Sequence, residues 1–139
     1  MDQYKANTIN TSTPEELTLM LYNGLVKFLM QAMNNVEKKE VEKAHTCIVK
    51  AQNIITEFKV TLDMKYPVSE TMYLLYDYMN QRLITADIKK DNEILEEVLN
   101  LAKEFRDTWA QAMKLAKHSA PKQAIGPNTA SPLAAAGLV

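Results

Sequence analysis

Apolar residues recur every three or four positions in four successive segments of this chain, and turn or capping signals bound each segment. This spacing places the apolar side chains on one face of an α-helix. The helices are expected at roughly 13–36, 40–63, 70–89 and 92–117, each about 35 Å long. Because the connections are short and no sustained alternation indicates a strand, the pattern predicts an all-α, antiparallel, up-down-up-down four-helix bundle.

Capping residues mark where these helices should start. Thr13 is the expected cap of the first helix, Pro14 occupies its first position, and Glu16 completes a capping box. Ser69 is the expected cap of the third helix, and Asp91 that of the fourth.

Composition divides the chain into three parts. Residues 1–12 are expected to form a short, loosely ordered N-terminal arm, and residues 13–117 the bundle. The tail 118–139 holds three of the five prolines and two of the three glycines, with almost no charge. Because it has no helical stripe, the tail is expected to be disordered or linker-like.

Charge and composition exclude several classes of protein. The net charge is −1 with both signs interspersed, which does not favour nucleic acid as a partner. The first residues lack the apolar core of a signal peptide, and no apolar run is long enough for membrane insertion. The single cysteine fits a reducing compartment, so we expect a soluble protein of the cytoplasm.

The sequence gives no basis for catalysis, a metal or another cofactor. A di-iron bundle needs two Glu-x-x-His units, and only Glu42 and His45 form one, because Leu115 stands three residues before His118. Cys47 lies on an apolar stripe and points away from His45, so we interpret it as an inert core cysteine.

The first helix has more apolar surface than one stripe needs. We expect its core face to be the stripe of Leu17, Met20, Leu21, Gly24, Leu25 and Phe28. A second apolar set then lies on much of the opposite side, comprising Leu19, Tyr22, Val26, Leu29 and Met30. The sequence therefore predicts that a partner segment, or the N-terminal arm through Tyr4 and Ile9, covers this second set.

The second and third helices carry a weaker excess of the same kind. Val49 and Val60 lie away from the core stripe of the second helix. In the third helix, Tyr73 and Ile84 flank the core stripe on one side, and Leu74 and Tyr78 flank it on the other. At the level of sequence these residues fit an interface and an ordinary exposed surface equally well.

Several segments resemble the FliS family of flagellar secretion chaperones. These are Tyr4 followed by TINTSTPEELTLMLYNGLVKFL at 8–29, KAQNIITEF at 50–58, MYLLYDYMNQRLITADIKKD at 72–91 and LEEVLNLAKEFRDTWAQAM at 95–113. The resemblance covers about residues 4–117, and the order of its motifs is specific. It implies a non-catalytic cytosolic four-helix bundle.

The resemblance also implies partners. Such proteins bind the disordered C-terminal segment of newly made flagellin, prevent its premature polymerisation, and pass the complex to the export gate of the flagellar type III secretion system. The arm lies over part of the client groove and moves on binding. Tyr4 matches the second of two arm tyrosines, whereas the first would fall at Met1 and is missing.

The residues expected to bind the partner come from the apolar pattern of the helices and from the family resemblance. They are Tyr4, Ile9, Leu19, Leu21, Tyr22, Leu25, Val26, Leu29, Val49, Val60, Tyr73, Tyr76, Tyr78, Met79, Arg82 and Leu83. Arg82 fits either a contact to the client or an ordinary exposed arginine. The alternative function is a self-associating helical module, and a weak homodimer is a further expectation.

Overall fold

The computed structural model describes residues 12–118, and these form four helices. Helix α2 spans Pro14–Glu37, α3 spans Val41–Thr61, α4 spans Val68–Lys89 and α5 spans Asn92–His118. The expected positions of all four helices agree with these bounds to within about two residues. None of the helices in residues 12–118 is long and apolar enough to cross a bilayer.

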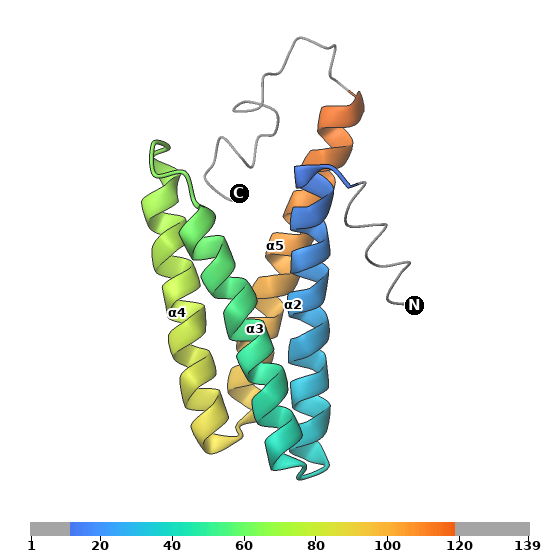
Figure 1. Cartoon of the computed structure of the whole chain (residues 1–139), viewed down its shortest axis with the longest axis vertical. Coiled ribbons are helices and arrows are strands. Elements are labelled where there is room, and N and C mark those ends of the chain that lie inside the picture. The colour runs from blue at the N-terminus through green and yellow to red at the C-terminus, as the bar shows by residue number, and fades with distance from the viewer. Residues whose placement is uncertain (1–11, 119–139) are drawn as a thin grey trace.

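The four helices run alternately up and down and form an antiparallel bundle, as the sequence predicted (Figure 1). Helix α2 packs against α3 and α5, and α4 packs against the same two helices, so the helices follow one another around the bundle. Two hydrogen bonds hold α5 antiparallel to α2. Trp109 Nε1 donates to the Glu15 carbonyl oxygen at 3.0 Å near one end, and Asn92 Nδ2 donates to the Met33 carbonyl oxygen at 3.1 Å near the other.

The start of α2 is the capping box that the sequence indicated. The Thr13 hydroxyl accepts from the Glu16 backbone N–H at 3.1 Å, and Glu16 Oε1 accepts from the Thr13 N–H at 2.9 Å. Pro14 is the first helical residue, where its missing N–H costs nothing. At the start of α5, Asp91 Oδ1 accepts from the Glu93 N–H at 2.8 Å, which confirms Asp91 as the expected cap of this helix.

The expectation that Ser69 caps α4 is wrong. Helix α4 begins at Val68, and the flanking residue is Pro67, whose backbone is already helical. Ser69 is fully buried and its hydroxyl donates to the Asp63 carbonyl oxygen at 2.5 Å. Its side chain therefore closes the connection between α3 and α4, and it does not satisfy a free N–H at the helix start.

Two lysines in the connections adopt left-handed backbone conformations. Lys39 has a φ of 60° between α2 and α3, and Lys90 has a φ of 51° between α4 and α5. Residues with a Cβ adopt this region at a cost of about 1–2 kcal/mol. Lys90 recovers part of that cost, because its ammonium group donates to Asp87 Oδ1 at 2.8 Å.

Candidate partner-binding surface

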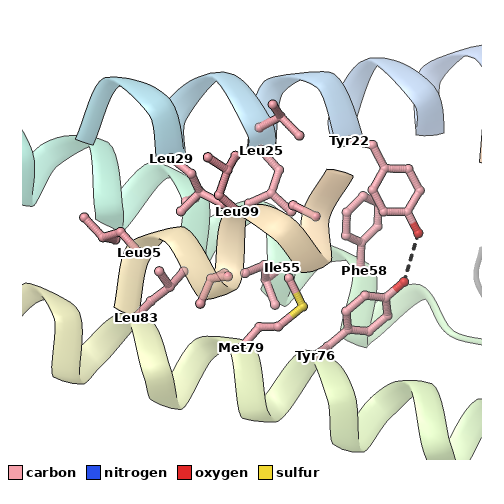
Figure 2. Close-up of a cluster of buried hydrophobic side chains, with 14 of the residues drawn as sticks. Tyr22, Leu25, Leu29, Ile55, Phe58, Tyr76, Met79, Leu83, Leu95 and Leu99 are labelled. Atoms are coloured by element: carbon pink, nitrogen blue, oxygen red, sulfur yellow. Dashed lines mark hydrogen bonds between the residues drawn. The ribbon is translucent and has the colours of Figure 1, made fainter. Parts of the chain in front are cut away.

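Helix α2 has two apolar faces, but their roles are the reverse of those expected. The buried face comprises Thr18, Tyr22, Leu25, Val26, Leu29 and Ala32. Leu17, Leu21, Gly24 and Phe28 are only half-buried, and Met20 is exposed. The prediction that Tyr22, Val26 and Leu29 face away from the core is therefore wrong, because all three belong to the buried core cluster. Figure 2 shows Tyr22 and Leu29 inside the bundle.

An aromatic cluster fills the core around Tyr22. The Tyr22 ring lies 4.4 Å from the Phe58 ring and 6.4 Å from that of Phe105, centroid to centroid. The Tyr22 and Tyr76 hydroxyls are 3.0 Å apart and form a hydrogen bond across the bundle (Figure 2). Burial raises the pKa of Tyr22 to about 12 despite this hydrogen bond, and burial also raises the pKa of Tyr76. Both phenols are therefore neutral structural groups at physiological pH.

Three further expected partner-binding residues, all in α4, are also core residues. Tyr76, Met79 and Leu83 are buried and point toward α2, α3 and α5 (Figure 2). Their spacing of three and four residues is that of a core stripe, so their burial agrees with the helical pattern. Together with Tyr22, Leu25, Val26 and Leu29, they have almost no exposed surface in this conformation.

The expected residues that do reach the surface form a smaller set. Val60, Tyr73 and Tyr78 are exposed, whereas Leu19, Leu21, Val49 and Arg82 are half-buried. Tyr4 and Ile9 lie outside the described residues, so the structure gives no position for the arm. The tail after residue 118 lies outside them as well.

Polar pairs connect α3 and α4 along their outer side. Lys59 Nζ lies 2.9 Å from Asp77 Oδ1, Asn80 Nδ2 donates to Thr56 Oγ1 at 3.2 Å, and His45 Nδ1 lies 2.5 Å from Asp87 Oδ2. The hydrogen bond to Asp77 raises the pKa of Lys59.

Apolar side chains flank these pairs on both helices. Val60 of α3 is 70% exposed, and Tyr73 of α4 is 41% exposed with the Lys59 ammonium group 4.8 Å from its ring centroid. Ile84 of α4 is also exposed, and Val49 of α3 is half-buried. We call this strip, defined by Val49, Val60, Tyr73 and Ile84, the α3/α4 face.

A second seam lies between α2 and α3, where the half-buried face of α2 meets Ile54. Leu17, Leu21, Gly24 and Phe28 contribute from α2. The ammonium groups of Lys27 and Lys50 lie 5.7 and 5.4 Å from the Phe28 ring centroid, so two positive charges border the apolar strip. We call this strip the α2/α3 seam. It lies on a different side of α3 from the α3/α4 face, because α2 and α4 both pack against α3 but are not neighbours of each other.

Arg82 of α4 is held by a contact with α5. Its Nε donates to Glu97 Oε1 at 2.8 Å, and the Tyr78 hydroxyl donates to the other oxygen of the same carboxylate. The hydrogen bonds from Tyr78 and Arg82 lower the pKa of Glu97, and the bond to Glu97 raises the pKa of Tyr78. Arg82 therefore has an intramolecular partner, which favours a structural role over a free client-binding arginine.

The residues considered for metal binding and nucleophilic chemistry have structural partners. His45 pairs with Asp87, and within residues 12–118 no three His, Cys, Asp or Glu side chains gather as a metal site. Cys47 is half-buried rather than fully in the core, and its sulfur lies 3.6 Å from Asn35 Nδ2 and 3.8 Å from Gln31 Oε1.

The sequence reasoning omitted several exposed apolar residues from the candidate surface. They are Met20, which was assigned to the core stripe, Leu74 and Ile84, which were noted only as flanking residues of the third helix, and Met64 and Ile88. Leu17 and Phe28 were omitted because they were assigned to the core stripe of the first helix, and Ile54 was not considered as a surface residue. The available signal was the second apolar stripe of the first helix, which was recognised but assigned to the wrong side.

Comparison with known proteins adds independent evidence. The family model described as "Flagellar protein FliS" matches residues 1–116. The chain belongs to the FliS family. The flagellar secretion chaperone FliS of Bacillus subtilis (strain 168) is 45% identical over 111 residues, which cover 80% of this chain and 84% of the relative. The FliS of Salmonella typhimurium (strain LT2) is 30% identical over 108 residues, covering 76% and 80%. The Escherichia coli (strain K12) FliS is 26% identical over 110 residues, covering 77% and 81%.

Family membership decides the general function. FliS proteins are flagellar secretion chaperones, which supports the assignment of this chain as a flagellar export chaperone. FliS is a family of chaperones and not of enzymes, so the prediction of no catalytic activity is confirmed. A chaperone of this family requires a secretion substrate as its partner.

Proposed function

We propose that this FliS protein binds the C-terminal segment of flagellin in the cytosol, keeps its apolar assembly surface covered, and delivers it to the flagellar export gate. The observation that carries this proposal is the placement of apolar side chains outside the core. They lie along the α2/α3 seam and the α3/α4 face, on two sides of the same helix. An extended or helical client can follow both strips by wrapping around α3.

The energetics favour a client that wraps widely. A segment that is disordered when free loses conformational entropy on binding, and a large contact area offsets that loss. Each well-buried apolar anchor contributes about 1.5–3 kcal/mol. Three of the residues expected from the sequence to bind the partner can serve as anchors, because each has surface outside the core: Val60, Tyr73 and Leu21.

We further propose that residues 1–12 act as a displaceable arm beside the bundle domain 13–117, with Tyr4 and Ile9 as its anchors. An arm that covers an apolar strip until the client arrives keeps the free chaperone soluble. Deleting residues 1–10 should then leave the helix content unchanged and increase ANS fluorescence. Unchanged ANS fluorescence after the deletion argues against the arm as a cover.

Calorimetric titration with a synthetic peptide of the flagellin C-terminal segment tests the main proposal. We expect tight one-to-one binding with a large negative heat-capacity change, because apolar surface is buried. Val60→Asp should weaken binding by roughly 10–150-fold, the equivalent of losing one anchor. No binding of the wild-type chain at micromolar concentrations would reject the proposal.

Met30→Asp is the matched control for Val60→Asp. Met30 is also an exposed apolar residue in a helix, but it lies on α2 about 120° around the axis from Gly24 and about 160–180° from Phe28 and Leu21. We expect this variant to bind the peptide as the wild type does. A loss of binding equal to that of Val60→Asp would show that added charge, and not the site, causes the effect.

Self-association is the competing use of the same apolar strips. Tyr73, Ile84 and Val60 are exposed and could pair with a second copy of the chain. Sedimentation velocity at low protein concentration separates the two functions, because a stable monomer excludes an obligate oligomer. We expect a monomer that forms a one-to-one complex with the peptide.

A further inference from the structure

Gly24 lies within α2, where a glycine is less favourable than an alanine. Neither of the usual structural reasons for a glycine applies at this position. Its φ lies outside the left-handed region, and a Cβ built on it has Ile54 Cδ1 as its nearest neighbour at 3.5 Å, an ordinary van der Waals contact. The described part of the fold therefore has room for alanine, and the packing of α2 on α3 does not require the glycine.

The position of Gly24 on the surface suggests another reason. It is half-buried in the middle of the α2/α3 seam, with Leu21 one turn before it and Phe28 one turn after it. From Leu17 to Phe28 the seam is roughly 16 Å long, which is the length of about three helical turns. A missing Cβ at its centre forms a notch through which a second backbone can approach closely.

Charge indicates which kind of segment fits. The ammonium groups of Lys27 and Lys50 both lie within 5.7 Å of the Phe28 ring centroid and so border the seam near Gly24. Two ammonium groups at this end of the seam favour acidic side chains on the occupant.

We propose that Gly24 determines client specificity by letting an amphipathic client helix of about three turns cross the α2/α3 seam at close range. This inference rests on the proposed function and deepens it. The client helix places a small residue, glycine, alanine or serine, against Gly24, and acidic residues beside it meet Lys27 and Lys50. Helix axes pack 8–10 Å apart according to the side chains at the crossing, so a Cβ at Gly24 pushes the client helix away.

Gly24→Ala tests this proposal because stability and binding should change in opposite directions. The midpoint of thermal unfolding should rise by a few degrees, since alanine is the better helix former and the Cβ fits. The Kd for the flagellin C-terminal peptide, measured by calorimetry on the full chain, should increase by at least about tenfold. A variant that is more stable and binds as tightly as the wild type overturns the proposal.

Asn23→Ala is the matched control, because it makes a similar change at the adjacent exposed residue of α2. It should also raise the unfolding midpoint and leave the Kd unchanged. Lys27→Gln and Lys50→Gln should each weaken binding about three- to fivefold at low salt, with a smaller effect at high salt. Equal losses of affinity in Asn23→Ala and Gly24→Ala overturn a specific role for Gly24.

The remaining outcomes separate the alternatives. If the arm and not the client occupies the notch, Gly24→Ala expels the arm and tightens peptide binding, which overturns the client contact. If the wild-type chain does not bind the peptide at all, the proposed function itself fails. Peptide binding by the wild type with an unchanged Kd for Gly24→Ala rejects only the role of Gly24.

Discussion

Removing one hydroxyl of the Tyr22–Tyr76 pair should destabilise the bundle more than removing both. In Tyr76→Phe, the Tyr22 hydroxyl stays in a site with 0% solvent exposure and loses its hydrogen-bond partner at 3.0 Å. A buried unsatisfied hydroxyl costs about 1–3 kcal/mol. The double variant Tyr22→Phe/Tyr76→Phe leaves an apolar aromatic cluster of nearly the same shape, so most of that loss should be recovered.

Urea unfolding followed by circular dichroism at 222 nm measures this difference. A loss of about 1–3 kcal/mol is a large part of the roughly 5–15 kcal/mol that stabilises a domain, and it lowers the unfolding midpoint by roughly 4–12 °C. The double-mutant cycle gives the coupling between the two hydroxyls directly. If Tyr76→Phe is no less stable than the double variant, the two hydroxyls do not stabilise each other as argued.

The same pair predicts how stability depends on alkaline pH. Because burial raises the pKa of Tyr22 from 10.0 to about 12, the unfolded chain loses this proton at a lower pH than the folded chain. Stability is therefore fully present below pH 10 and falls as the pH rises toward 12, by up to about 2–3 kcal/mol for Tyr22. The double phenylalanine variant should lose less stability over this pH range than the wild type. An equal loss in both proteins would contradict the attribution of the pH dependence to Tyr22.

Three other predictions test the packing. Leu29→Ala should cost about 2–5 kcal/mol in urea unfolding because it empties a core site, whereas Phe28→Ala, on the half-buried face, should cost clearly less. Lys39→Gly should stabilise the protein by about 0.5–1 kcal/mol by relieving a φ of 60°, and an unchanged midpoint would count against strain there. Trp109, the sole tryptophan, is fully buried, so its emission should shift to longer wavelength on unfolding; red-shifted emission in the native state would contradict its burial.

The sequence predicted the bundle well because its signals are local. The Thr13 capping box, the Asp91 cap and the three- and four-residue spacing depend on a few neighbouring residues each. Pairs between helices were not predictable in this way. The contact of His45 with Asp87 depends on the register between α3 and α4, which the spacing within either helix does not specify.

The reversed faces of α2 have a physical explanation. Between Leu17 and Met30 the two apolar stripes are similarly strong, so their angles alone do not show which faces the core. The deciding residues come later in the helix. The stripe through Phe28 continues into Gln31 and Asn35, whereas the stripe through Leu29 continues into Ala32 and Val36, which remain apolar to the helix end. Following each stripe over the whole helix would have identified the buried face.

This reversal changes which residues form the candidate surface, but the surface still depends on a second apolar face of α2. The second apolar face of α2 exists, and it is the half-buried α2/α3 seam. Seven of the residues first expected to contact the partner instead hold the bundle together, including Tyr22 and Tyr76 through their hydroxyl pair. We therefore propose Leu21 and Phe28, which have surface outside the core, as partner contacts in their place.

NMR cross-saturation from a protonated flagellin C-terminal peptide to methyl-labelled, perdeuterated chaperone tests this central claim most directly. We predict that saturation reaches the methyl groups of Leu17, Leu21 and Ile54 on the α2/α3 seam and leaves those of the buried Leu29 and Ile48 unaffected. Saturation confined to α5, with no effect at the seam, would contradict it.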